Sequence, residues 1–112
     1  MTWSATSEGE IWDAINAAEA KMTPEQLRLW ECISIIPIKW VQRPYGDLVG
    51  GFWVVAILGR FVVWFNDIED GFSISEYSAY GEITAYGASQ DALEVTVQHL
   101  VNIVANGTGR RI

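Results

Sequence analysis

The chain of 112 residues is poor in the residues that build metal centres, disulfides and cationic surfaces. Its single cysteine, Cys32, excludes an internal disulfide, and its single histidine, His99, makes a metal centre built on cysteine and histidine improbable. Only 7 basic residues stand against 14 acidic ones, giving a formal net charge of −7. Nucleic-acid binding needs a cationic footprint, and anionic lipid surfaces attract basic segments. We therefore expect neither nucleic acid nor a membrane as partner.

The sequence also lacks the segments that direct a chain into or across a membrane. Residues 1–7 contain no basic region and no apolar run, which a signal peptide requires. The longest apolar run is shorter than a membrane span and is interrupted at Gly59-Arg60. Because one unpaired cysteine suits a reducing compartment, we expect a cytoplasmic protein.

The sequence is instead rich in apolar residues, and these are concentrated in one hairpin. Two apolar runs, Phe52–Leu58 and Phe61–Asn66, are joined by Gly59-Arg60, which suits a type II′ turn. That turn predicts the pairs Leu58–Phe61, Ala56–Val63 and Val54–Phe65. A strand with one solvated face should alternate apolar and polar residues, and these strands do not. Both faces must therefore be covered, by helices, by a second subunit or by another partner.

One hairpin face then lacks an obvious cover within the chain. A wholly apolar face of this size is larger than monomers normally expose. We therefore predict a homodimer, and the pattern leaves open which hairpin face meets the helices. The predicted dimer interface consists of Trp53, Val55, Ile57, Val62 and Trp64.

Helix signals lie at both ends of the chain. Ser7 and Glu10 form a predicted capping box that opens a helix over residues 8–21. Thr23 and Pro24 open a second, short helix, which Pro37 limits. Ser89 is a predicted N-cap for a closing helix whose buried stripe recurs at helical spacing. That stripe comprises Leu93, Val97, Leu100, Val101 and Val104.

The remaining segments complete one α+β domain over residues 1–112. Strands are predicted at residues 35–42, in the hairpin, at residues 72–75 and at residues 82–86. The result is an antiparallel meander of four to five strands, with two N-terminal helices and one C-terminal helix on one face.

No catalytic or cofactor signature is present, and we predict no catalytic residue, metal or cofactor. His99 points away from the predicted stripe of its helix, and Cys32 is expected to be a buried, inert thiol. If Gly71 is aligned with the obligatory glycine of a calcium-binding loop, the apolar Ile68 falls at a position that must supply an oxygen ligand. The spacing therefore does not fit a calcium loop. A hydrolase that uses a pair of carboxylates is one functional hypothesis, and it ranks third, after the two binding functions described at the end of this section.

Residues 67–86 combine five carboxylates with aromatic rings and contain no lysine or arginine. Rigid rings and carboxylates suit a surface that contacts a basic protein partner. Equally, the rings could be core and the acidic residues merely solvated. The predicted partner-binding residues are Asp67, Glu69, Asp70, Glu76, Tyr77 and Tyr80.

The same region carries a recognisable pattern. Asn66, Glu69-Asp70-Gly71-Phe72 and Ser75 are followed by Tyr80-Gly81-Glu82-Ile83 and by Gln90-Asp91-Ala92-Leu93. The stretch over residues 52–100 resembles a group of small, largely uncharacterised bacterial proteins. Such proteins are similar in type to immunity proteins, which neutralise bacterial toxins. The resemblance implies no catalytic residue and no cofactor.

Two functions follow as hypotheses. The first is a non-enzymatic cytoplasmic protein-binding module, immunity-like, that uses the acidic, tyrosine-bearing surface. The alternative is a small homodimeric domain that binds an apolar or aromatic ligand in a pocket lined by Trp40, Trp53 and Trp64.

Overall fold

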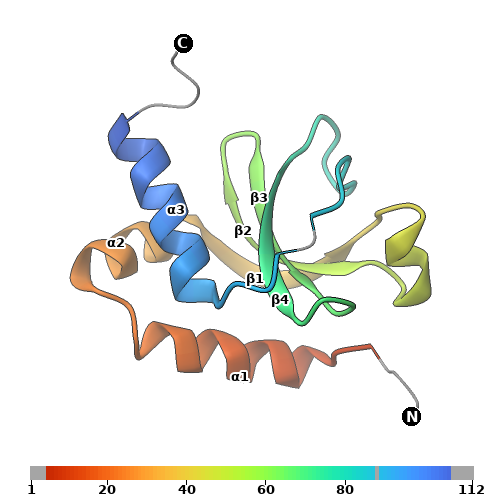
Figure 1. Ribbon diagram of the computed structural model, residues 1–112, viewed down its shortest axis with the longest axis horizontal. Coiled ribbons are helices and arrows are strands. Elements are labelled where there is room, and N and C mark those ends of the chain that lie inside the picture. The colour runs from red at the N-terminus through yellow and green to blue at the C-terminus, as the bar shows by residue number, and fades with distance from the viewer. Residues whose placement is uncertain (1–4, 88, 107–112) are drawn as a thin grey trace.

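The computed structural model describes residues 5–87 and 89–106, which form three helices and one antiparallel sheet (Figure 1). The strands follow one another in the sheet in chain order, as a meander. This confirms the α+β class with two N-terminal helices and one C-terminal helix. The elements are α1 Glu8–Glu19, α2 Pro24–Ile33, β1 Ser34–Trp40, the 3-10 turn η1 Tyr45–Leu48, β2 Phe52–Leu58, β3 Phe61–Asn66, β4 Gly71–Glu76 and α3 Leu93–Asn106.

Both N-terminal helices begin at the predicted capping boxes. In α1 the Ser7 hydroxyl accepts a hydrogen bond from the Glu10 amide at 3.2 Å, and the Glu10 carboxylate accepts one from the Ser7 amide at 2.8 Å. Thr23 and Gln26 make the same reciprocal pair at α2. α1 ends at Glu19, two residues earlier than predicted, and β1 begins directly after α2.

One face of the sheet packs against all three helices. The buried side chains of α1, α2 and α3 belong to a single cluster with residues of β2, β3 and β4. The sheet residues in that cluster are Val55, Ala56, Val63, Phe65 and Phe72. The apolar stripes of the helices therefore meet a sheet face that is apolar along its length.

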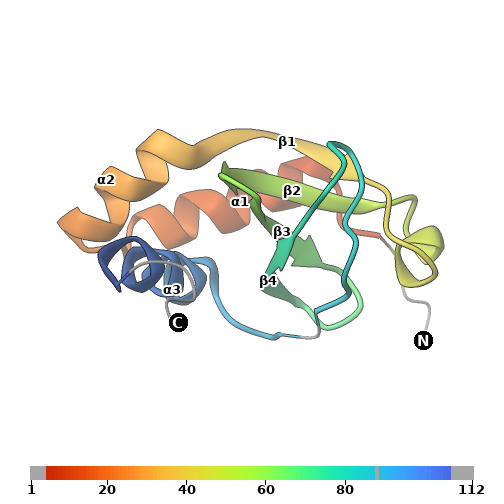
Figure 2. The same ribbon diagram turned by 90° about the horizontal axis from the view of Figure 1, so that it is seen from above.

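The second face of the sheet is covered by loops of the same chain. η1 and the loop of residues 77–86 lie on the side away from α2 and α3 (Figure 2). Ile83 of that loop is 2% exposed and joins Trp40, Phe52 and Trp64 in a second buried cluster. The rings of Phe52 and Trp64 are 4.6 Å apart. Both faces of the hairpin are thus covered within one chain.

A β-bulge at Val55 makes part of the predicted hairpin register wrong. Leu58 pairs with Phe61 and Ala56 with Val63 as predicted, and Gly59 has the positive φ of 59° that a type II′ turn requires. Beyond the bulge, however, Val54 pairs with Trp64 instead of Phe65. Consecutive residues Val55 and Ala56 therefore both face the helices.

The bulge divides the five residues of the predicted dimer interface. Trp53 and Val55 pack with the helix-side cluster, whereas Ile57, Val62 and Trp64 pack with the second cluster. Val55, Val62 and Trp64 are fully buried. The uncovered face that motivated the dimer does not exist in this structure, and self-association stays a prediction without that support.

The predicted fifth strand is wrong. Residues 82–86 form one isolated parallel bridge, between Glu82 and Val41, and otherwise cross the second face. Ser73 and Ser75 hold this segment because their hydroxyls donate to the carbonyls of Gly87 and Ala85, at 3.2 and 3.1 Å. The segment crosses the face instead of extending the sheet because covering an apolar face removes more apolar area from water than pairing at the sheet edge would.

Two further predictions concern single side chains on the helices. His99 is exposed, as predicted. Cys32 is also exposed, so the expected buried thiol is wrong. The buried residues of α2 are Gln26, Trp30 and Ile33, and this spacing places position 32 on the opposite side of the helix.

Replacing Ser75 should loosen the loop that covers the second face. The Ser75 hydroxyl accepts a hydrogen bond from the buried Trp64 indole at 3.0 Å while donating to Ala85. Ser75→Ala leaves both groups without this partner, and we expect a loss of about 2–4 kcal/mol in the free energy of unfolding. Ser78→Ala, at an exposed position, should stay within about 0.5 kcal/mol. Urea unfolding measures both, and equal midpoints would contradict this role.

Candidate functional site

The structure does not bring the six predicted partner-binding residues together. Asp67, Glu69 and Asp70 lie in the turn before β4, whereas Glu76 and Tyr77 lie at its far end. Strands rise about 3.3 Å per residue, so the length of β4 separates the two groups by roughly 17 Å. The single surface predicted from the sequence is therefore at least two surfaces.

The two tyrosines pack around Trp40. Tyr77 is half-buried, with its ring 5.1 Å from that of Trp40 and nearly perpendicular to it, and its hydroxyl donates to the Gly59 carbonyl at 3.0 Å. The Tyr80 ring is 4.8 Å from Trp40 but remains 70% exposed. Tyr77 therefore contributes mainly to the second cluster, and Tyr80 keeps surface for contact.

Asp67 anchors the start of α1. Its side chain is buried, and one oxygen, Oδ2, accepts a hydrogen bond from the Thr6 amide at 2.6 Å. The Thr6 carbonyl in turn accepts from the Trp53 indole at 2.8 Å. These two bonds tie the residues preceding α1 to the β3–β4 turn and to β2. Asp67 therefore positions backbone and offers little surface to a partner.

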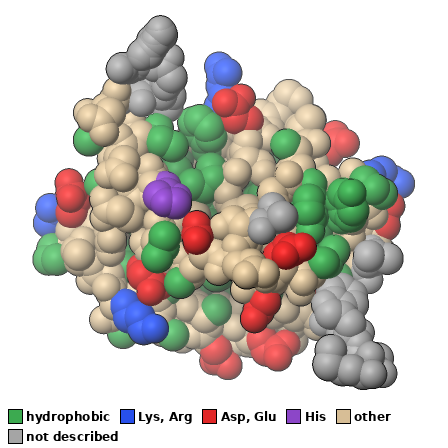
Figure 3. All heavy atoms as spheres, viewed as in Figure 1, with side chains coloured by type: hydrophobic (Ala, Val, Ile, Leu, Met, Phe, Trp, Pro, Cys, Tyr) green, Lys and Arg blue, Asp and Glu red, His purple; other side chains and the backbone are tan. Residues whose placement is uncertain are grey.

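This anchoring creates an acidic corner, which we define as Glu8, Glu10, Glu69 and Asp70. Figure 3 shows acidic side chains gathered along the lower edge of the molecule, over α1 and the β3–β4 turn. Among residues 5–87 and 89–106 there is one ion pair, Arg43–Asp47 at 3.9 Å, and it does not involve the corner. The corner therefore presents carboxylates without cationic partners.

Sequence reasoning missed Glu8 and Glu10 as part of this site. Both were assigned to the start of a helix, and Glu10 does use its carboxylate in the capping box. Glu8 accepts a weak hydrogen bond from the Trp12 indole at 3.3 Å. Their proximity to the turn depends on the bond between Thr6 and Asp67, 61 residues apart, for which no local pattern exists.

Asn66 shapes the turn that carries Glu69 and Asp70. Its buried side-chain oxygen accepts from the amides of Ile68 and Glu69 at 2.9 and 3.1 Å. Its amide group donates to the Gly87 carbonyl at 2.7 Å. Asp70 adopts φ 58°, a left-handed conformation that aspartate tolerates better than most residues. The backbone of the turn is therefore fixed before any partner arrives.

Gly71 and Phe72 hold the turn against the segment that leads into α3. A Cβ on Gly71 would lie 2.2 Å from the Gln90 Cα, so only glycine fits there. The Phe72 amide donates to the Asp91 carbonyl at 2.8 Å, and the Phe72 ring is buried in the helix-side cluster. Four residues of the pattern described in the sequence analysis thus have structural roles: Asn66, Gly71, Phe72 and Ser75. In the same turn, Asp70 is exposed and Glu69 is half-buried.

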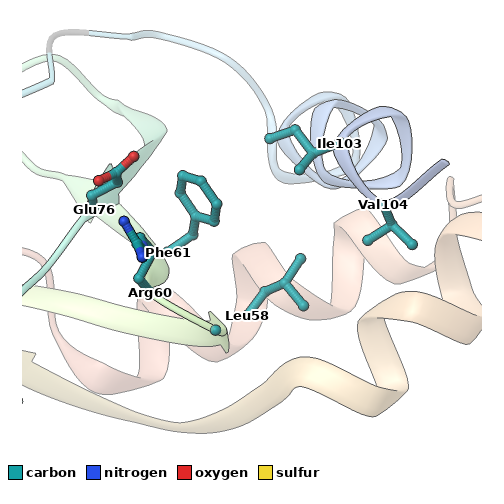
Figure 4. Close-up of a pocket in the computed structure, with 7 residues that line it drawn as sticks. Leu58, Arg60, Phe61, Glu76, Ile103 and Val104 are labelled. Atoms are coloured by element: carbon teal, nitrogen blue, oxygen red, sulfur yellow. The ribbon is translucent and has the colours of Figure 1, made fainter. Parts of the chain in front are cut away.

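Several hollows lie elsewhere on the surface. One of them, with a volume of about 660 Å³, is a groove between the hairpin tip and the last turns of α3 (Figure 4). Arg60 and Glu76 stand on its hairpin side, and Ile103 and Val104 on its α3 side. A second hollow of about 530 Å³ also contains Arg60 and Glu76. A third, of about 220 Å³, lies between α1, α2 and β1.

The three tryptophans proposed for a ligand pocket do not form one. Trp40 and Trp64 are buried and packed against other rings. Trp53 is half-buried, with its indole bound to Thr6 and the Lys39 Nζ 5.3 Å from its ring centroid. None of the three hollows described above is lined by these residues.

In the described ranges, no three His, Cys, Asp or Glu side chains gather closely enough to bind a metal ion. The helices of this part of the chain are all too short or too polar to span a bilayer.

Substitution of Gly71 should disrupt the turn itself. Because the added Cβ of Gly71→Ala meets backbone atoms of Ser89 and Gln90, which cannot move independently, we expect a loss of about 3 kcal/mol or more. Gly59→Ala is the matched control, since open space surrounds that position and only its φ of 59° opposes a side chain. It should cost about 1–2 kcal/mol. Chemical denaturation compares the two, and a smaller loss for Gly71→Ala would contradict the close approach.

Comparisons with known proteins give no match. No protein-family model fits the chain, no curated protein matches its sequence and no solved structure matches its fold. The function must therefore be argued from the surface chemistry.

Proposed function

We propose that the protein is a non-enzymatic, cytoplasmic protein-binding module that captures a basic partner at the acidic corner. The resemblance to small, largely uncharacterised bacterial proteins, which are similar in type to immunity proteins, supports this class of function. The observation that carries the proposal is the hydrogen bond from Thr6, just before α1, to Asp67 of the β3–β4 turn, together with four carboxylates of the corner that form no ion pair among the described residues.

Electrostatics favours this interaction in two ways. A net charge of −7 steers a basic protein toward the surface over a Debye length of roughly 8 Å at physiological salt. At contact, lysine or arginine side chains can then pair with Glu69 and Asp70, which form no ion pair with another described residue. A preformed turn also lowers the entropy lost on binding.

The test removes the charges of the turn without changing its conformation. Glu69→Gln and Asp70→Asn together neutralise two carboxylates, and asparagine accepts the left-handed backbone at position 70. Two exposed ion pairs are worth about 0.4–2 kcal/mol, so affinity for the captured partner should fall about twofold to thirtyfold. Affinity capture from the native host followed by binding kinetics at two salt concentrations measures this loss, which should appear mainly in the association rate.

A matched control separates the corner from overall charge. Glu31→Gln with Glu82→Gln changes the net charge equally at exposed positions outside the corner. This control should bind as the wild type does. Equal binding by the wild type, the turn variant and the control would contradict the proposal. So would a melting temperature of the turn variant low enough for unfolding to explain its loss of binding.

A second candidate function is binding of an apolar ligand, by a monomer or a homodimer. The groove of Figure 4 favours it, because Leu58, Phe61 and Ile103 give apolar walls. Light scattering combined with the variant Phe61→Ala discriminates the two functions. If the protein is a dimer and Phe61→Ala dissociates it, the groove is supported as the binding site. If the protein is a monomer and Phe61→Ala leaves partner capture unchanged, the acidic corner is supported instead.

A further inference from the structure

The hollow between α1, α2 and β1 has the chemistry of a receptor for one cationic side chain. Its volume is about 220 Å³, whereas an engineered cavity of about 150 Å³ already admits benzene. Its walls are two indoles, aliphatic side chains and a single carboxylate. They comprise Trp12, Ile15, Glu19, Trp30, Ile35 and Ile36, with Ser34 at one end.

One stripe of α1 forms the first wall. Glu8, Trp12, Ile15 and Glu19 follow at intervals of four, three and four residues, so they lie along one side of the helix. From Glu8 to Glu19 the helix rises about 16 Å. The stripe therefore runs from the acidic corner, at Glu8, to the hollow, at Glu19.

Hydrogen bonds hold the polar and aromatic walls in place. The Trp30 indole donates to Glu19 Oε2 at 2.8 Å, and the Trp12 indole donates to Glu8 Oε2 at 3.3 Å. Trp30 is 2% exposed, whereas Trp12 keeps 38% of its surface. The carboxylate of Glu19 is thus oriented by a buried indole and retains its second oxygen, Oε1, for another donor.

An irregularity in β1 forms the rim. Five residues of β1, from Ser34 to Ile38, lie opposite only three residues of β2, from Ala56 to Val54. The extra length bulges outward and leaves Ile36 75% exposed beside the hollow. Ile38, farther along the same edge strand, is 46% exposed. Exposed aliphatic side chains around a hollow are typical of a contact surface.

The charge of the hollow selects the occupant. Glu19 is the only charged residue among its walls, and it forms no ion pair with any described residue. A cationic group pairs favourably with this carboxylate, and the aromatic walls favour a guanidinium over an ammonium. Guanidinium is planar, weakly hydrated and able to stack on indole while pairing with a carboxylate.

We propose that this hollow receives an arginine side chain of the basic partner, with Glu19 as its counter-ion and Trp12 and Trp30 as its walls. The proposal rests on the proposed function, because it concerns the same partner. It adds a second contact, at the other end of α1 from the acidic corner. Tryptophan and arginine are the residue types that most often dominate interface energies.

The test uses Nα-acetyl-arginine methylamide as the probe and its citrulline counterpart as the uncharged isostere. Indole N–H signals in nitrogen-15 NMR spectra, assigned with Trp12→Phe and Trp30→Phe variants, report binding at the two walls. We expect saturable shifts of both signals with the arginine probe, with a dissociation constant on the order of 10 mM. The citrulline probe should bind at least about threefold more weakly.

Variants locate the charge that matters. Glu19→Gln keeps an oxygen acceptor for the Trp30 indole, so the fold should persist while affinity for arginine falls about fivefold. Glu31→Gln, which makes the same change in net charge outside the hollow, should leave affinity unchanged. Equal binding of arginine and citrulline, or an unaffected Glu19→Gln, would overturn the proposal.

The outcome is separable from that of the proposed function. The corner variant Glu69→Gln, Asp70→Asn lies outside the hollow and should titrate with arginine as the wild type does. If arginine binding fails while partner capture still depends on the corner, the hollow alone is refuted. If arginine binds at the hollow while capture ignores the corner, the proposed function alone is refuted.

Discussion

The central constraint on this molecule is a hairpin with apolar side chains on both faces. A sheet of this composition is stable in water only when both faces are covered. The helices cover one face, and residues 77–86 with η1 cover the other. Unlike an amphipathic helix, this loop has no continuous apolar stripe, so hydrogen bonds must hold it on the sheet. The hydroxyls of Ser73 and Ser75 and the side-chain amide group of Asn66 supply these attachments. The side-chain oxygen of the same Asn66 shapes the turn that carries Glu69 and Asp70.

The sequence predicted well whatever depends on neighbouring residues. Capping boxes at Ser7 and Thr23, the hairpin limits and the turn at Gly59 each follow from short-range chemistry, and the structure has them all. The bulge at Val55 was not predictable, because every nearby residue is apolar and a slipped register leaves the pattern unchanged. The supposed fifth strand failed for a related reason. Alternation around Ile83 identifies a buried side chain but not whether its backbone pairs at an edge or crosses a face.

The candidate site likewise contains some residues that local sequence patterns predict and others that they do not. Glu69 and Asp70 were predictable as acidic residues of a turn, but Glu8 and Glu10 enter the site through a bond spanning 61 residues. Tyr77 shows the opposite error, since aromatic residues beside carboxylates suggested a contact surface where the ring mainly packs on Trp40. The hollow beside Glu19 depends on α1, α2 and β1 together and on a bulge in β1. No sequence pattern within any one of these elements predicts this hollow.

Both proposed contacts share one physical design, in which backbone or indole hydrogen bonds fix a carboxylate-bearing element before binding. At the corner, Asn66 and Gly71 fix the turn. At the hollow, the Trp30 indole orients Glu19. Exposed ion pairs are weak largely because two long side chains lose freedom when they meet and because water screens them. An element that is already ordered removes part of that entropy cost, and a carboxylate set against indole rather than open water is screened less. An acidic module of this size can therefore gain specificity from the placement of a few carboxylates rather than from the total charge that surrounds them.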